Sequence, residues 1–439
     1  MRRALCPVET LYVGQRSRAV LSCTLRGRLD IETLSAAFDA VTEAHPALRT
    51  RIVPDGEGFA LDLLDEAGRP RLSTRTGAAE DAYATELNTP LPVGGPLSRA
   101  VLVSAPEGDG HLFVLSVDHT VVDGHSGIAL HNEIWDRYRA LAEGEERPGA
   151  ADSTPGWAVP VSELLPAVDE AATAAYLELR AAEARRHPAE LVAYDVTEAS
   201  AVDGRIEVCR LTLDEEHTGR LRRSARAAGV SVHALVAAAL LTTARRCLPG
   251  DGPRTLGCLS PVDLRSRLSP PVPALVMVPA VTTHLQTLDV APESDPVELA
   301  RTVHARLGDF VAGDGPYHEM RITPEIPRNP TLQLATVIAT NMGVVPGPRL
   351  PKGLEATDVR LVPAREQYFP AAGRSPVMAC VVAFEGRLAI EFPYFTACFS
   401  PAFVRAFRDG VRAVLDACAD AVELVPTAAD RGVSPHRPL

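Results

Sequence analysis

Lysine is almost missing from the sequence, because Lys352 is the only one in 439 residues and the other basic side chains are arginines. Aromatic residues are also scarce, at 5%, whereas hydrophobic residues reach 46%. Together with abundant Ala and Pro, the arginine bias is typical of a GC-rich coding sequence and carries no functional information by itself. The composition predicts an ordinary globular protein with a core of Ala, Val and Leu.

Several features that define other classes of protein are absent. The formal net charge of -12 argues against a protein that coats nucleic acid, since that role needs a positive field over the binding face, although local basic patches remain possible. Eight cysteines are scattered without a CxxC pair, which favours reduced, buried thiols in the cytoplasm. We expect no signal peptide, because MRRALCPVETLYV has no apolar h-region and no small-residue cleavage site. The longest apolar stretch, residues 230–244, is shorter than the roughly 20 residues of a membrane span, so we expect no span.

The length and the order of predicted elements indicate two α+β halves. A chain of 439 residues exceeds the usual size of one hydrophobic core. Strand and helix patterns occur in both halves, and residues 145–165, rich in Pro, Gly and Ala, look like a linker. We expect an N-terminal domain over residues 1–165, a linker with a bridging helix over 166–200, and a C-terminal domain over 201–439.

The segment VDHTVVDGHSG, residues 117–127, follows the apolar run LFVLS and precedes a helical pattern, so it forms the turn from a buried strand into a helix. At this place His119 would stand at the wall of a cleft, where a neutral imidazole acts as a general base toward a hydroxyl or an amine. Asp123 follows across a tight turn, in which Gly124 permits backbone geometry that a side chain would forbid. The carboxylate would orient the histidine or hold the turn through a cation.

Other interpretations of these residues stay open from the pattern alone. His119 is equally consistent with a hydrogen-bonded core histidine, and Asp123 with the N-cap of the following helix. An HxxxDxH set of His119, Asp123 and His125 would suit a metal ion. A serine nucleophile fits poorly, because the residues around Ser126 lack the G-x-S-x-G spacing.

The segment as a whole resembles the HHxxxDG motif of the chloramphenicol acetyltransferase-like superfamily. That superfamily includes condensation domains, plant acyltransferases and the polyketide-associated acyltransferases of the phthiocerol dimycocerosyl transferase type, to which the chain is most similar. Further segments match in family order: PVETLYV at 7–13, HPALRTRI at 45–52, PLSRAVLV at 96–103, PVDLRSRL at 261–268 and PRNPTLQLATVIATNMG at 327–343. The resemblance implies an α/β sandwich fold, with two acetyltransferase-like domains meeting in a V, an active-site tunnel between them, and crossover segments from the second half.

The resemblance also implies a mechanism. His119 would take the proton of the acceptor as it attacks a thioester, without an acyl-enzyme, and Asp123 would pair with Arg265 to shape the loop that presents the histidine. The first histidine of the motif is replaced by Asp118, whose carboxylate is expected to raise the pKa of His119. Asn341 and Ser126 are candidates for contact with the oxyanion or the substrate.

The resemblance predicts an O-acyltransferase that moves an acyl group from a thioester to a hydroxyl of a natural product or lipid. No cofactor or metal is expected beyond the co-substrate, which is either CoA or the phosphopantetheine of an acyl carrier protein. Arg222 and Arg226 share a helix face that would dock an acidic carrier protein, although a solvated surface face explains them as well. The alternatives are an amide-forming condensation-like enzyme, a docking domain without activity, and a metal-dependent hydrolase.

Overall fold

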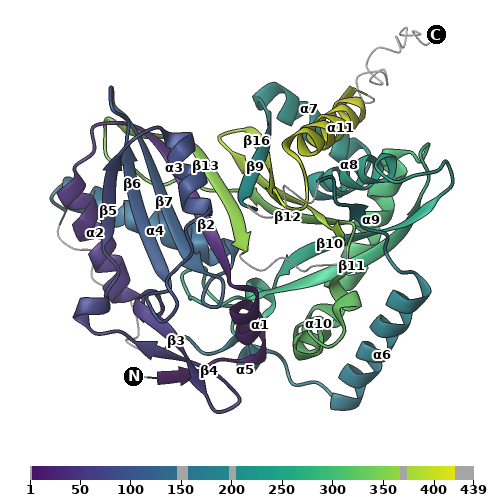
Figure 1. Ribbon diagram of the computed structural model, residues 1–439, viewed down its shortest axis with the longest axis horizontal. Coiled ribbons are helices and arrows are strands. Elements are labelled where there is room, and N and C mark those ends of the chain that lie inside the picture. Colours follow the sequence, from purple (N-terminus) through teal and green to yellow (C-terminus); the bar gives the residue numbers. More distant parts are fainter. Residues whose placement is uncertain (1, 146–156, 197–203, 366–372, 421–439) are drawn as a thin grey trace, which may run out of the picture.

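The computed structural model describes residues 2–145, 157–196, 204–365 and 373–420. Each half of the chain forms a lobe around its own β-sheet, and the two lobes stand side by side (Figure 1). This arrangement confirms the predicted α/β sandwich fold with two similar halves.

The N-terminal lobe contains a five-stranded sheet in the order β13-β2-β7-β6-β5. Its strands are β2 (Ser17–Gly27), β5 (Leu72–Thr76), β6 (Ser98–Ser104), β7 (Gly110–Asp118) and β13 (Leu354–Arg365). A smaller sheet joins β1 (Arg2–Ala4), β4 (Gly58–Leu63) and β3 (Thr50–Asp55). One face of the larger sheet is covered by α2 (Ile31–Ala44) and α4 (Gly124–Ala142), and the other by α3 (Ala79–Leu87).

The edge strand β13 comes from the second half of the chain. It runs antiparallel to β2 along nearly its whole length, from Leu354 opposite Gly27 to Arg365 opposite Ser17. This strand is the crossover segment that the family resemblance predicted. An ion pair ties it to the other lobe as well, since the buried Arg360 on β13 contacts Glu391 on β16 at 2.9 Å.

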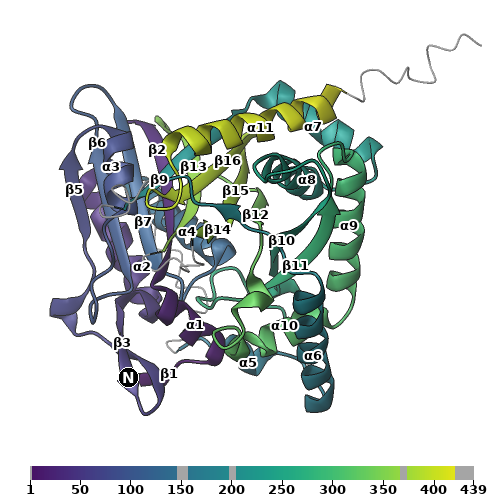
Figure 2. The ribbon, with the colours of Figure 1, turned by 45° about the vertical axis from the view of Figure 1, so that its right-hand side comes forward.

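The C-terminal lobe contains a six-stranded sheet in the order β11-β10-β12-β15-β16-β9. Its strands are β9 (Ile206–Leu213), β10 (Arg254–Asp263), β11 (Val281–Val290), β12 (Val337–Val344), β15 (Val377–Phe384) and β16 (Arg387–Phe395). One face packs against α7 (Glu215–Ala227), α8 (Val232–Arg246), α9 (Pro296–Ala312) and α11 (Pro401–Asp420), as Figure 2 shows. The two-residue strands β8 (Val192–Ala193) and β14 (Arg374–Ser375) pair separately.

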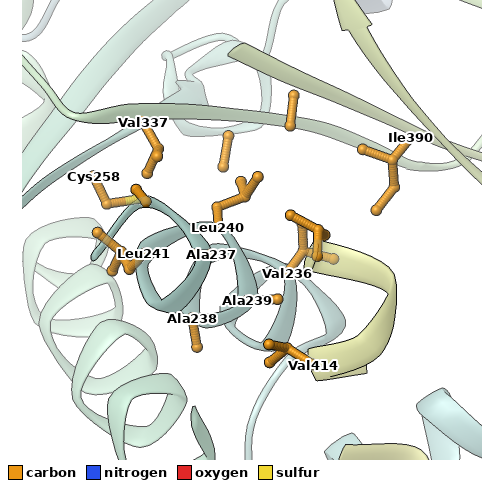
Figure 3. Packing of buried hydrophobic residues seen from close by; sticks show 14 of the residues in the cluster. Val236, Ala237, Ala238, Ala239, Leu240, Leu241, Cys258, Val337, Ile390 and Val414 are labelled. Carbon is orange, nitrogen blue, oxygen red and sulfur yellow. The ribbon is translucent and has the colours of Figure 1, made fainter. Parts of the chain in front are cut away.

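Helix α8 forms the centre of this lobe. Every residue from Ala234 to Arg245 is buried, because the helix is enclosed by the sheet on one side and by α9 and α11 on others. Its small side chains allow close packing, and Figure 3 shows Leu240 and Leu241 between the sheet residues Cys258 and Val337 and the neighbouring helices. The long apolar stretch of the sequence is therefore a core helix. Among the described residues no single helix is long and apolar enough to span a membrane, and α7 with α8 passes that test only as a pair bent by 98°.

Alternation along the strands separates the two faces of the C-terminal sheet. On β10, Leu256 and Cys258 pack under the helices, whereas Leu259, Pro261 and Asp263 line a cavity on the opposite face. The cavity therefore lies on the face that looks toward the N-terminal lobe.

The predicted linker falls partly outside the described residues, which omit 146–156 and 197–203. Between these gaps lie α5 (Val161–Leu164) and α6 (Glu170–Arg186). Helix α6 is the predicted exposed helix, and Arg180 is its buried residue. Arg180 contacts Glu319 of α10 (Gly315–Arg321) at 3.1 Å, so this helix packs against the C-terminal lobe.

Candidate active site

A cavity of about 540 Å³ lies between the lobes. Its lining comes from β10, β11, β12 and β15 of the C-terminal sheet, from β13, from α1 (Pro7–Gln15) and from the turn after β7. Most of the lining is apolar. His119, Asp123, Gly124 and Asn341 of the sequence-predicted site line it, together with His125.

His119 is the first residue after β7, and its backbone N–H donates to Ser17 O at 2.9 Å. Its ring stacks on the ring of Tyr12 from α1, with centroids 4.2 Å apart and an interplanar angle of 8°. The Nδ1 atom of the ring is buried and forms no hydrogen bond with the described part of the chain. The backbone carbonyls of His119 and Val122 nevertheless act to raise the pKa of the ring. Nε2 is consequently the ring atom that is open to the cavity.

Burial lowers the pKa of His119 to about 4, and the positive charge of Arg365 contributes in the same direction. The imidazole is therefore neutral near pH 7, as a general base requires. The net shift is thus opposite in direction to the one expected from Asp118, because loss of hydration outweighs the favourable charges around the ring. The Asp118 carboxylate instead accepts a hydrogen bond from Thr120 N at 2.9 Å, which shapes the turn.

Asp123 stabilises the turn through hydrogen bonds to both oxygens of its carboxylate. Its Oδ2 accepts hydrogen bonds from Arg265 Nε at 3.1 Å, Arg265 Nη2 at 2.9 Å and Ala280 N at 2.9 Å. Its Oδ1 accepts from Ser126 N at 2.8 Å and thereby caps α4. The side chains of Asp123 and Arg265 are only 3% and 5% exposed. The Asp123 carboxylate therefore forms the ion pair with Arg265 that the resemblance implied. It also caps α4, as the alternative interpretation expected.

Gly124 is needed for a different reason from the one expected. Its φ is not positive, and a Cβ at this position would lie 2.6 Å from the sulfur of Met342, which belongs to β12 of the other lobe. The glycine therefore lets a side chain of the C-terminal lobe approach the turn closely. This corrects the prediction that the backbone conformation itself demands glycine.

The two candidates for oxyanion contact are placed differently. Asn341 on β12 lines the cavity, and its side-chain oxygen accepts from Gly343 N at 2.8 Å, which leaves its amide hydrogens for a substrate. Ser126 is fully buried, and its hydroxyl donates to Asp123 Oδ1 at 3.0 Å. The cavity lining does not include Ser126, so the geometry gives no support to a contact between its hydroxyl and a substrate.

The HxxxDxH arrangement gains no support as a metal site. Asp123 is fully engaged by Arg265, Ala280 and Ser126, so its oxygens are not free to coordinate. Across the part of the chain that the structure describes, no group of three or more His, Cys, Asp or Glu side chains is arranged to hold an ion.

Two residues at the site were not predicted from the sequence. Tyr12 lies in the segment PVETLYV, whose resemblance to the family was noted without a role for any side chain. Arg365 ends β13, a crossover strand whose residues were not predicted, and it lines the cavity. An aromatic residue on a short N-terminal helix and one arginine among many carry no signal that a single sequence would reveal.

Comparisons with known proteins show the family to which the chain belongs. The model of the condensation domain matches residues 17–247, and that of the phthiocerol/phthiodiolone dimycocerosyl transferase C-terminus matches residues 202–393. The chain belongs to the condensation-domain family. Phthiocerol/phthiodiolone dimycocerosyl transferases are similar over most of its length: that of Mycobacterium leprae is 27% identical and that of Mycobacterium tuberculosis 26%, each over 89% of this chain and 91% of the relative.

Solved structures show the same fold. Polyketide synthase associated protein 5 of Mycobacterium tuberculosis superposes with a TM-score of 0.73 at 22% identity, covering 96% of this chain and 98% of that one. A trichothecene 15-O-acetyltransferase of Fusarium sporotrichioides gives 0.73 at 12% identity, covering 95% of each chain. With the transferases among its relatives, the protein is an acyltransferase.

The predicted docking helix lies away from the cavity. Arg222 is half-buried and Arg226 exposed on α7, which packs on the face of the C-terminal sheet opposite the cavity. Docking at α7 stays a prediction: reversing both residues to Glu should raise KM for a carrier-borne donor and leave KM for an acyl-CoA unchanged. An equal change in KM for both donors would contradict docking at this helix.

The pKa of His119 predicts the pH profile. Only the neutral ring accepts a proton, so kcat/KM should stay level down to about pH 5 and fall near the pKa of about 4, rather than near the usual value of 6.5. The folded ring binds a proton less readily than the unfolded one, so stability is also lost as the pH falls from 6.5 toward 4. An acid limb centred near 6.5 in the kcat/KM profile would contradict the buried, neutral state.

Proposed function

We propose that the protein transfers an acyl group from a thioester to a hydroxyl of a lipid or natural product, with His119 as the general base. The observation that carries the proposal is the His119 imidazole, stacked on Tyr12 at the wall of a mostly apolar cavity between two lobes. The donor is an acyl-CoA or an acylated carrier protein, and no further cofactor takes part. The names of the relatives, which include a dimycocerosyl transferase and a 15-O-acetyltransferase, favour a hydroxyl over an amine.

The proposed proton path uses one ring nitrogen. Nε2 of His119 takes the proton of the acceptor hydroxyl while the oxygen attacks the thioester carbonyl. The tetrahedral intermediate collapses, the carbon–sulfur bond breaks, and the imidazolium returns the proton to the departing thiolate. Holding both reactants in one cavity contributes about 7 kcal/mol or more when the alignment is good.

The other residues of the site position the general base and stabilise the negative charge that develops on the oxyanion. The Tyr12 ring covers one face of the imidazole, so the ring plane is fixed. Asp123 and Arg265 hold the turn that carries His119, and we propose that they move no proton. Asn341 supplies the hydrogen-bond donor for the developing oxyanion.

Mass spectrometry of intact products tests this function directly. The protein is incubated with a panel of acyl-CoA and carrier-borne thioesters, each with an alcohol and with the amine of the same skeleton. We expect ester products that depend on His119. Amide products alone would favour the condensation-like alternative, and the absence of any transfer across the panel would favour a docking domain.

Chelation separates the proposal from a metal-dependent hydrolase. Prolonged dialysis against EDTA is expected to leave the transfer rate unchanged, since His119 must stay free to exchange protons. The metal content of the purified protein is measured in the same samples. Stoichiometric zinc, together with loss of turnover on its removal, would reverse this assignment.

A further inference from the structure

Arg365 occupies a junction between two cavities. It is the last described residue of β13, and its half-buried side chain lines the main cavity. It also lines a small side cavity of about 40 Å³, whose remaining walls are mostly apolar and aromatic. Met378 and Ile338 border both spaces, so the side cavity is adjacent to the main one at Arg365.

Within the described residues, the half-buried Arg365 has no ion pair of the kind that holds two other arginines of the protein. Its Nε is buried without a hydrogen bond, and no carboxylate in the described ranges forms an ion pair with it. By contrast, Arg265 is held by Asp123, and Arg360 by Glu391. A guanidinium in a mostly apolar wall has few groups to interact with, so an anion bound there would gain a strong contact.

The N–H groups of the Arg365 guanidinium indicate which kind of anion would bind there. A guanidinium presents parallel N–H groups that match the two oxygens of a carboxylate, and the apolar walls strengthen such a contact. We propose that Arg365 forms a carboxylate-binding subsite, so that one of the two reactants carries a carboxylate group besides the reacting thioester or hydroxyl. This inference refines the proposed function and rests on it for the identity of the reactants.

The position of the subsite excludes the phosphate of the donor arm. Arg365 and His119 line the same cavity, so the subsite and the reacting centre share one enclosed space. The phosphate of CoA or of a carrier protein is separated from the sulfur by the full length of the pantetheine arm. With the thioester at His119, that phosphate lies well outside the junction. The carboxylate therefore belongs either to the acyl group or to the acceptor.

Binding measurements on matched probes test the subsite without turnover. Isothermal titration compares hexanedioyl-CoA with hexanoyl-CoA, and hydroxyhexanoate with hexanediol, so each pair differs in one carboxylate. In the wild-type protein the carboxylate should tighten binding about tenfold or more in one pair, which identifies the reactant that carries it. Arg365→Met should remove this preference and leave the Kd of the neutral probe unchanged, whereas Arg365→Lys should retain part of it.

An exposed arginine outside the proposed subsite provides the control variant. Arg328→Met removes an exposed arginine that pairs with Glu325, and it should keep the preference. Equal affinity within both pairs, or a preference that survives in Arg365→Met, would overturn the subsite. A loss of kcat in Arg365→Met with all Kd values unchanged would also overturn it, because the guanidinium would then act on the oxyanion. Failure to form any ester, with the Arg365-dependent preference intact, would instead contradict the proposed function.

Discussion

Replacing His119 with alanine is expected to lower kcat for acyl transfer by about a hundred- to ten-thousand-fold, the range that general-base catalysis contributes. The loss should fall on kcat more than on KM, since the ring forms one part of a wall that many apolar side chains build. The fold should survive, because the side chain has no hydrogen bond whose removal would leave a buried group without a partner. Steady-state kinetics and thermal unfolding measure the two effects separately.

The matched control for this variant is His304→Ala, which removes an exposed histidine from α9 on the helical face of the C-terminal sheet. It should retain wild-type kcat. If His119→Ala kept at least half of wild-type kcat, the general-base assignment would fail. A large fall in the unfolding temperature with His119→Ala would make the ring a structural element of the core instead.

Breaking the Asp123–Arg265 pair is expected to cost about 3 to 5 kcal/mol of the free energy of unfolding in either single alanine variant. Both side chains are nearly inaccessible, so each single variant leaves a buried charge without its partner. The double variant should lose less than the sum of the singles, since neither charge then remains. Both single variants should also lower kcat, because the turn that carries His119 is held by this pair.

Chemical denaturation of the wild type, the two single variants and the double variant closes the cycle. Strict additivity would contradict the coupling that the geometry requires. The exposed pair Arg349–Asp136 provides a control cycle, because its side chains are 72% and 30% exposed and solvent screens their attraction. Little change in stability is expected from any of its variants.

The helices were largely predictable from the sequence, and the strand that completes the N-terminal sheet was not. The sequence around α2 indicates a helix, because apolar residues at helical spacing follow Asp30, whose side chain accepts from Thr33 N at 2.7 Å as the N-cap. Helix α9, Pro296–Ala312, has an apolar pattern of the same kind. The resemblance predicted crossover segments without their residues, and β13 could not be located, because its partner β2 lies more than 300 residues away in sequence and no local pattern encodes such a pairing.

The contacts of the candidate site were also predictable only in part. The resemblance to the family placed His119 in the motif and predicted the contact between Asp123 and Arg265, whose side chains meet across 142 residues. Composition and spacing could not indicate that Tyr12 stacks on the ring or that Ser126 turns away from the cavity, because both depend on how distant elements pack. The sign of the pKa shift at His119 was missed for the same reason, since burial is a property of the folded cavity and not of neighbouring residues in the chain.

The origin of β13 has a consequence for how the chain is made. A ribosome releases the residues of β2 and β7 long before those of β13, yet β13 is the strand that covers the free edge of β2. Until residue 365 has emerged, the nascent N-terminal lobe carries an open strand edge whose N–H and C=O groups can pair with another chain. We therefore expect a fragment that ends before β13 to aggregate rather than to fold, and a separately supplied C-terminal half to rescue it. Synthesis order, and not only the final contacts, makes the two halves of this enzyme a single folding unit.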